Sequence, residues 1–380
     1  IVVPQDQGRT KSWFLWIGLP TLVALSGLFK VRDLDVWWRV RTGEWIWAHK
    51  EIPNTDPFSH TAEGPWNCVE PAANLFLYAF HAAFGPMGLS LAGAVMALFV
   101  GITTVSLAKY AIDRGTSSGP VFVAVGLFVA ASNFRFGPKP ELFSLCGLAS
   151  LLLVLHMVDR SRRWKLLFAV PILVLIWAWL HRGSTVSLPV LGAAMVVWGL
   201  RRDTRPLAWA ALASLILTLG ALLLTPGMAG SLASAGSVVS TSAYTQYIGE
   251  WQPLTLDALW STMPLLAVLT VLWALLAPAQ RRLHFGTLVV LGLGFMAVRH
   301  VRFVPLFALA MVPEVAWGLS RLLERHRDAL ARQVRPAVLS GLLVAGAIGA
   351  ISWPYLNRDV RTWGAGVHDF HRPEDAAAFL

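Results

Sequence analysis

Long apolar segments recur along this chain, and they restrict its fold more than any other feature. A helix that crosses a bilayer needs about 20 mainly apolar residues, and segments close to that length follow one another from end to end. A soluble core cannot enclose so many of them. The composition agrees, because 56% of the residues are hydrophobic and only 14% are charged, where soluble domains carry about 25%. The sequence predicts an all-α polytopic membrane protein.

Hydropathy predicts about eleven transmembrane helices, with ten to twelve as the range. A twelfth apolar run, 71–84, is too short to span and is predicted to be re-entrant or interfacial. The predicted spans cover 13–29, 87–108, 120–134, 141–158, 166–181, 184–200, 207–225, 259–277, 285–298, 304–319 and 336–353.

The distribution of charge predicts the orientation of these spans. With the N-terminus placed in the cytoplasm, 18 of the 31 basic residues but only six of the 21 acids fall in the segments assigned to the cytoplasmic side. Cytoplasmic loops of membrane proteins carry such an excess of Lys and Arg. We therefore expect a multi-pass protein with its N-terminus in the cytoplasm and its functional face outside, and the preference for Arg over Lys favours a bacterial inner membrane. The net charge of +10 does not favour nucleic-acid binding, because the basic clusters alternate with apolar runs, and membrane lipids are the expected partners.

One transmembrane module is predicted over residues 1–353, and 354–380 begin an extracytoplasmic C-terminal segment. The first extracytoplasmic loop, 31–85, carries Asp33 and Asp35 directly after the first span. Two such carboxylates hold a divalent cation (Mg²⁺ or Mn²⁺) in some sites, and one of them acts as a general base in others. The alternative is a capping aspartate on an amphipathic helix at 33–49, whose buried side would include Val36, Val40 and Trp47.

Basic side chains cluster at the predicted outer ends of several spans. A charge near the hydrocarbon edge is costly unless it is paired or faces a cavity. One interpretation pairs these cations with nearby acids, and the other makes them a socket for an anionic lipid phosphate. The cations are Arg32, Arg39, Arg41, Arg135, Lys139, Arg182, Arg299 and Arg302, and the acids are Asp33, Asp35, Glu44, Glu141 and Glu250.

Two histidines, His181 and His300, lie beside these arginines at span ends. Each is either a donor to a substrate oxygen or an ordinary interfacial residue. The sequence has no HExxH motif, no glycine-rich phosphate loop and no recognisable Ser-His-Asp order, which disfavours hydrolase and NTPase functions. It also lacks the paired broken helices that are typical of secondary transporters.

Several motifs, taken in order, resemble those of bacterial GT-C-type integral membrane glycosyltransferase-like proteins. The first loop is similar to the family pattern D-x-D-x-W-W followed by G-x-W-I and I-P-x-x-D-P-F-S. The further matching segments are "FRFGPKPELFSL" (134–145), "IWAWLHRGS" (176–184), "YIGEWQPL" (247–254) and "VRHVRFVPLF" (298–307). The resemblance extends over nearly the whole chain.

This resemblance implies transfer of a sugar from a polyprenyl-phosphate donor to an extracytoplasmic acceptor. The family's catalytic or metal-binding acid after the first span maps onto Asp33 and Asp35, and Glu70 is a further catalytic candidate. The donor phosphate would be bound by Arg135, Lys139, Arg182, Arg299 and Arg302, and the acceptor-side candidates are His181, Glu250 and His300.

The chain departs from the family pattern at several of these positions. Val69 replaces the histidine of H-E-W-L, Trp179 replaces the asparagine of N-L-H-G, and Arg182 replaces the following glycine. These changes leave two hypotheses. Either the altered positions set acceptor choice, or the protein is a non-catalytic GT-C-like subunit that scaffolds a larger membrane complex with protein partners.

Overall fold

The computed structural model describes residues 13–61, 64, 66–112, 118–230, 232, 247–261, 263–279, 283–326 and 365–366. Within those residues the fold is helical and contains no β-strand. A π-helical turn, Phe14–Gly18, leads into α2. The helices of the first half are α2 (Leu19–Ser26), α3 (Asp35–His49), α4 (Pro71–Phe84), α5 (Pro86–Ala111), α6 (Gly119–Ser132), α7 (Glu141–Ser161) and α8 (Val170–Leu180). Those of the second half are α9 (Ser187–Gly199), α10 (Arg205–Leu223), α13 (Leu256–Ser261), α14 (Pro264–Leu276), α15 (Phe285–Arg299) and α16 (Val304–Arg325).

Prolines define where many of these helices begin. Proline is favoured in the first turn because its fixed φ suits the helix and the N–H that it lacks has no intrahelical acceptor there. A proline occupies one of the first two positions of α2, α4, α5, α6, α8, α10, α14 and α16. Short 3-10 turns precede several helices, among them η3 (Asn133–Arg135), η5 (Arg182–Val186), η7 (Gly249–Trp251) and η9 (Val301–Phe303).

Ten of the eleven expected spans coincide with helices of the structure, and the eleventh, 336–353, lies outside the described residues. The segment expected at 259–277 differs in detail, because α14 begins only at Pro264. Met263 has an extended φ of −129°, as the residue before a proline is driven away from the helical conformation. The preceding residues form the separate helix α13.

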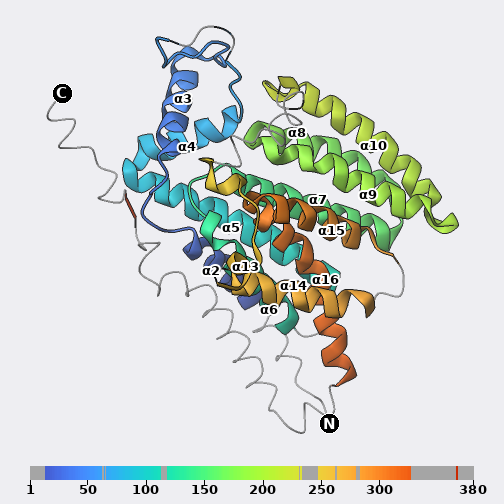
Figure 1. Cartoon of the computed structure of the whole chain (residues 1–380). Coiled ribbons are helices and arrows are strands. Elements are labelled where there is room, and N and C mark those ends of the chain that lie inside the picture. The colour runs from blue at the N-terminus through green and yellow to red at the C-terminus, as the bar shows by residue number, and fades with distance from the viewer. Residues whose placement is uncertain are drawn as a thin grey trace.

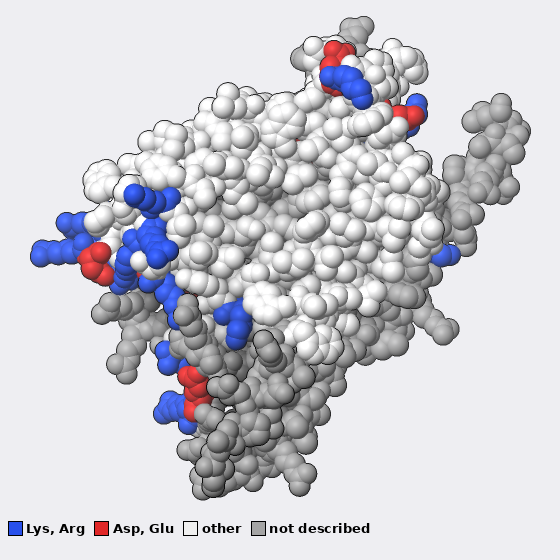
Figure 2. Space-filling view, turned by 180° about the vertical axis from the view of Figure 1, so that it is seen from behind, with Lys and Arg blue, Asp and Glu red and all other residues white. Residues whose placement is uncertain are grey.

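Four helical segments are long and apolar enough to cross a membrane: Pro86–Ala111, Glu141–Ser161, Arg202–Leu223 and Val301–Arg325. The other apolar helices are shorter, so the count of eleven spans stays a prediction. Figure 2 shows a broad surface without charged residues, with Lys, Arg, Asp and Glu confined to its edges. Long apolar helices and this uncharged surface are the features of a membrane protein.

The four long segments differ in how far the rest of the protein encloses them. In α16, 78% of the apolar stretch is buried, and the helix packs against α5, α6, α7, α14 and α15. In α10 only 28% is buried. Figure 1 shows α10 along one edge of the bundle beside α8 and α9. The core therefore lies around α16, and the exposed apolar side chains of α10 face the surroundings of the protein.

Helices α3 and α4 pack together at one end of the bundle (Figure 1). The two helices approach closely at Gly43, where a Cβ atom would lie 2.2 Å from the Asn74 carbonyl oxygen. The helix expected at 33–49 is present, and Val36 and Val40 are buried as expected. Trp47, expected on the same buried side, is instead 60% exposed. It lies one turn beyond the Gly43 contact, and Ile46 continues the buried face in its place.

Candidate functional site

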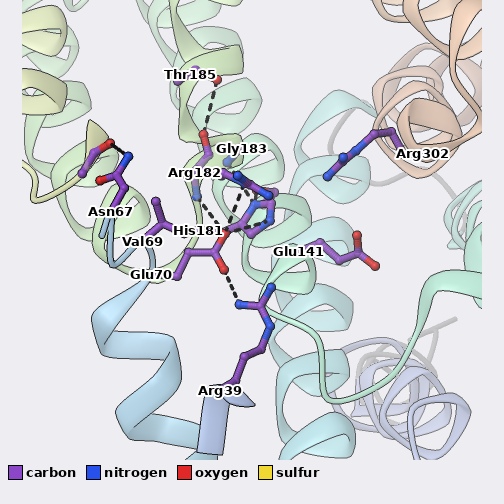
Figure 3. A network of polar contacts seen from close by, with 12 residues as sticks. Arg39, Asn67, Val69, Glu70, Glu141, His181, Arg182, Gly183, Thr185 and Arg302 are labelled. Carbon is purple, nitrogen blue, oxygen red and sulfur yellow. Dashed lines mark hydrogen bonds and ion pairs between the residues drawn. The ribbon is translucent and has the colours of Figure 1, made fainter. Parts of the chain in front are cut away.

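Glu70 is the centre of a buried ionic network that joins three separate segments (Figure 3). One carboxylate oxygen, Oε2, accepts a hydrogen bond from the Arg39 guanidinium of α3. The other, Oε1, lies 3.4 Å from Nε2 of His181 and 3.4 Å from the backbone N–H of Arg182. The Arg182 Nε atom lies 4.0 Å from the same oxygen. We call these four residues the Glu70 network.

The backbone at Glu70 is unusual as well. Glu70 has φ 66° and ψ 42°, in the left-handed region, and it immediately precedes Pro71 at the start of α4. Non-glycine residues adopt this conformation rarely, at a cost of order 1–3 kcal/mol. The bonds made by its carboxylate offset that cost. The Glu70 network therefore fixes the direction in which α4 leaves the loop.

The charge of Glu70 follows from these surroundings. Burial alone would raise the pKa of the carboxyl group, but His181, Arg39 and Arg182 together hold its pKa below the ordinary value. Glu70 is consequently a carboxylate at neutral pH. Because it is buried and committed to Arg39, its chemistry is that of a positioning residue rather than of a proton donor.

The His181 ring is held by a chain of hydrogen bonds that ends on α7 and α8. The indole N–H of Trp177 donates to Ser144 Oγ at 2.9 Å, and Ser144 Oγ lies 2.5 Å from His181 Nδ1. The backbone N–H of Gly183 also donates to Nδ1, at 3.0 Å. Nδ1 is therefore an acceptor, which assigns the proton to Nε2 and directs it at Glu70. Ser144 is buried, so it orients His181 and is not placed as a nucleophile.

Gly183 is required by this arrangement. A Cβ atom at this position would lie 2.3 Å from Ser144 Oγ and 2.7 Å from His181 Nδ1. We expect Gly183→Ala to lower the free energy of unfolding by about 1–3 kcal/mol, because overpacking displaces the ring. Thermal unfolding of the purified protein measures this. Gly192→Ala, in α9 with no atom within 4 Å of the added Cβ, is the matched control and should be neutral or stabilising by up to about 1 kcal/mol. Equal melting temperatures for the two variants would contradict the prediction.

A second ionic network, which we call the Glu250 network, connects four more segments. Arg135 of η3 contacts Glu141 at 2.5 Å and Glu250 at 2.7 Å. Arg302 of η9 lies 3.3 Å from Glu250 and 4.3 Å from the centre of the Trp251 ring. The pKa of Glu250 is lowered: partial burial opposes this, but the charges of Arg135 and Arg302 outweigh it.

The two networks lie next to each other at the same end of the bundle. Figure 3 shows Glu141 and Arg302 beside His181, and the charges of both act on the His181 ring. Arg302 in turn interacts with Arg182 and Arg135. Loops that lie up to 263 residues apart in the sequence, from Arg39 to Arg302, therefore meet in one polar region. We call it the Glu70 end of the bundle.

Asp33 and Asp35 take different positions. Asp33 accepts the backbone N–H of Asp35 at 3.1 Å through Oδ1, and its Oδ2 pairs with Lys139 at 2.9 Å. Asp33 thus closes a local turn before α3, but the N-cap residue of this helix is Leu34 and no side chain caps it, so the capping aspartate that one interpretation expected is not found. Asp35 is exposed in the first turn of α3. It lies four residues before Arg39, so the two side chains share one face of the helix.

The carboxylates do not form a convincing metal site. Both oxygens of Asp33 are engaged, and the described residues contain no group of three or more His, Cys, Asp or Glu side chains arranged to hold a metal ion. Mg²⁺ and Mn²⁺ prefer several oxygen ligands in octahedral geometry. The described residues therefore do not fit such an ion.

The expected phosphate-binding cations divide into engaged and accessible residues. Arg135 is enclosed between two acids, and Lys139 and Arg302 each pair with one. Arg182 differs, with 53% of its side chain exposed beside Glu70. Arg299, in the last turn of α15, is also exposed. Ion pairing therefore accounts for Arg135, Lys139 and Arg302. Arg182, although it contacts Glu70, and Arg299 keep exposed surface that is accessible to an anion.

His300 lies differently from the acceptor-side position expected of it. It is 1% exposed, its Nδ1 lies 2.8 Å from the Trp251 carbonyl oxygen, and its ring packs edge-on against Trp251. Backbone hydrogen bonds from Leu254 to Val298 and from Val301 to Gln252 run alongside. His300 therefore ties the 249–254 loop to the end of α15.

A second polar cluster, which was not predicted from the sequence, lies at the other end of the bundle. Glu314, in the buried part of α16, accepts hydrogen bonds from the Trp273 indole and, at 3.2 Å, from Thr287. The His284 ring lies between Glu314, at 3.7 Å, and Asp159, at 3.9 Å. The signal was an acid within the apolar run 304–319, since intramembrane acids are rarely without a partner.

Comparison with known proteins adds no family assignment. The chain matches no protein-family model and no curated protein sequence.

Proposed function

We propose that this protein is a membrane glycosyltransferase of the GT-C type, which moves a sugar from a polyprenyl-phosphate donor to an extracytoplasmic acceptor. One observation carries the proposal: the Glu70 end gathers ionic side chains from α3, α7, η3, η5, η7, η9 and the residue before α4 at one end of an apolar helical bundle. A lipid-linked donor would place its phosphate beside these ionic side chains and its polyprenyl chain alongside the apolar helices. One substrate would therefore contact both the charged end and the apolar surface of the bundle.

The chemistry divides between an exposed acid and the accessible cations. Asp35 takes the proton of the acceptor hydroxyl, whose oxygen attacks the anomeric carbon of the sugar. The bond between that carbon and the phosphate oxygen breaks, and the polyprenyl phosphate leaves with the electron pair. Arg182 and Arg299 neutralise the leaving phosphate through charge-assisted hydrogen bonds. Glu70 and His181 position Arg182, and Glu250 positions Arg302 on the neighbouring side.

The proposal includes a topology. Eleven spans, with the N-terminus in the cytoplasm of a bacterium, place the Glu70 end outside the inner membrane. The excess of basic residues on the opposite side supports this orientation. The sugar donor is then a lipid presented in the outer leaflet, and membrane lipids surround the module.

Cells expressing wild type, a deletion, or Asp35→Asn test the activity. We expect the Asn variant, expressed at the wild-type level, to match the deletion, with the polyprenyl-phosphate sugar accumulating and an envelope glycan missing. The measurement is the amount of lipid-linked sugar extracted from the membranes. Arg32→Gln, just before the D-x-D motif, serves as the charge-change control and should leave the lipid at its wild-type level.

The second candidate function is a non-catalytic subunit of a membrane complex. The engaged state of Asp33, Arg135 and Glu250 favours it, because a structural role requires only such ion pairs. If Asp35→Asn matches wild type while the deletion has a defect, the transferase proposal is wrong and this function replaces it. Stoichiometric co-purification of other proteins with the Asn variant would then identify the complex.

A further inference from the structure

A small open pocket lies at the end of the bundle opposite the Glu70 network. It has a volume of about 440 Å³ and is lined by Val197, Leu200, Arg201, Asp203 and Leu283. These residues come from the end of α9, from η6 (Arg202–Thr204) and from the segment before α15. The 21 residues of α7, from Glu141 to Ser161, separate the two ends by about 30 Å at 1.5 Å per residue. That separation equals the hydrocarbon thickness of a bilayer.

The apolar wall of this pocket is open to the outside of the protein. Leu200 is 70% exposed and Leu283 is 49% exposed. Trp209, in the first turns of α10, is exposed as well, and tryptophan is typical of the boundary between hydrocarbon and headgroups. Exposed leucines next to a boundary tryptophan are suited to contact an acyl chain.

The charged residues that line the pocket, Arg201 and Asp203, pair with each other, and an excess of positive charge surrounds them. Asp203 is already neutralised, since Arg201 lies 3.3 Å and Arg162 lies 3.5 Å from its carboxylate. Arg162 also lies 3.4 Å from Asp159. Arg163, Arg202 and Arg205 are exposed and make no ion pair within the described part of the chain. Figure 2 shows Lys and Arg gathered at this edge of the uncharged surface.

We propose that this pocket binds one anionic phospholipid, with its phosphate at Arg201 and at the exposed Arg202 beside the pocket, and an acyl chain against Leu200 and Leu283. Arginine matches a phosphate bidentately, and each basic residue near an anionic membrane surface strengthens binding about fivefold. A free anion would leave the leucine wall in water, whereas a phospholipid covers both walls. This site is separate from the proposed transferase site and does not depend on it.

Native mass spectrometry of the purified full chain tests the site. The probes are phosphatidylglycerol and phosphatidylcholine with identical acyl chains, added to the detergent-solubilised protein. We expect phosphatidylglycerol to be retained at least tenfold more than phosphatidylcholine, because two arginines contribute about fivefold each. The variant Arg201→Gln/Arg202→Gln should reduce that preference by about an order of magnitude or more. Arg321→Gln/Arg325→Gln removes two exposed charges from the end of α16, away from the pocket lining, and should retain the preference.

The apolar wall gives an independent test. Leu200→Gln leaves every charge in place and should weaken retention of phosphatidylglycerol severalfold while the melting temperature stays unchanged, because Leu200 is largely exposed. Equal retention of the two lipids, or an equal loss in the two double variants, would overturn the proposal. Glycerophosphoglycerol, which has no acyl chain, should not compete. If it competes as well as the lipid, or if Leu200→Gln has no effect, the pocket is a site for small anions and not for a phospholipid.

Discussion

Replacement of Glu70 by Gln is expected to lower the free energy of unfolding by about 3–5 kcal/mol, the largest stability effect that we predict for a single substitution. The change leaves the Arg39 guanidinium, which is 16% exposed, without its counter-ion in a buried position. Removal of one partner of a buried pair costs this much because the remaining charge stays desolvated. Glutamine also has only one acceptor oxygen, so it cannot replace both the oxygen that accepts from Arg39 and the oxygen that faces His181 and the Arg182 backbone. Thermal and chemical unfolding in detergent measure the loss.

A double variant separates the contribution of the Arg39–Glu70 ion pair to stability from the contribution of side-chain packing. Arg39→Met/Glu70→Met removes both charges and keeps apolar volume at both positions, so it should be more stable than either single variant. If the two single effects add up in the double variant, the two side chains are not coupled and the prediction is wrong. Arg41→Met, which removes an exposed arginine paired with Glu44 on the same helix, is the control and should cost less than about 1 kcal/mol.

The pH dependence of stability provides a second measurement on Glu70. Its pKa is lower in the folded protein than its ordinary value of 4.5. The carboxylate therefore contributes stability that is present above pH 4.5 and is lost as the pH falls through the lower, folded value. Wild type should lose stability in that acid range more steeply than Glu70→Gln. Parallel curves for the two proteins would contradict the assignment.

Arg182→Gln is expected to weaken binding of a polyprenyl monophosphate by about ten- to hundredfold, because a hydrogen bond between charged groups contributes about 1.5–3 kcal/mol. Arg182 is the exposed cation of the Glu70 network, and its removal leaves Arg39 to hold Glu70. Stability should change by less than about 1 kcal/mol. Binding is measured by titration of the purified protein with the lipid.

Arg41→Gln is the matched control for this experiment. It removes one exposed guanidinium from α3 at the same end of the molecule, where Arg41 pairs only with Glu44 among the described acids. Its binding should stay within about twofold of wild type. Equal losses in Arg41→Gln and Arg182→Gln would mean that the lipid senses overall charge, and the specific role of Arg182 would be wrong.

The positions of many helices can be predicted from the apolar periodicity of the sequence and from the residues that start each helix. Runs of apolar residues started by prolines such as Pro86, Pro120 and Pro206 contain their own start signals, so the positions of these helices follow from local sequence. The exposure of Trp47 shows what local sequence cannot predict. Whether it packs depends on where α4 ends its contact with α3, and that contact is set at Gly43 and Asn74, which local sequence does not reveal.

The candidate site was predictable as a set of residues but not as a set of pairs. Rim arginines and acids were visible in the sequence, and pairing of Lys139 with Asp33 and of Arg135 and Arg302 with Glu250 agrees with one of the two interpretations. Glu70 lies 31 residues from Arg39 and 112 residues from Arg182. Such partners are selected by the packing of α3, α4 and α8, so the sequence alone could not show that Glu70 joins them.

The conformation of Glu70 limits which amino acids the position can tolerate. Its left-handed backbone favours Gly or Asn, but glycine has no side chain and asparagine is one methylene too short to reach Arg39 and the Arg182 amide together. Glutamine has the length, yet it lacks the charge. The position thus requires a side chain that tolerates this backbone, reaches both partners and carries a negative charge. A saturation library at position 70, selected for folded protein, should return glutamate nearly alone.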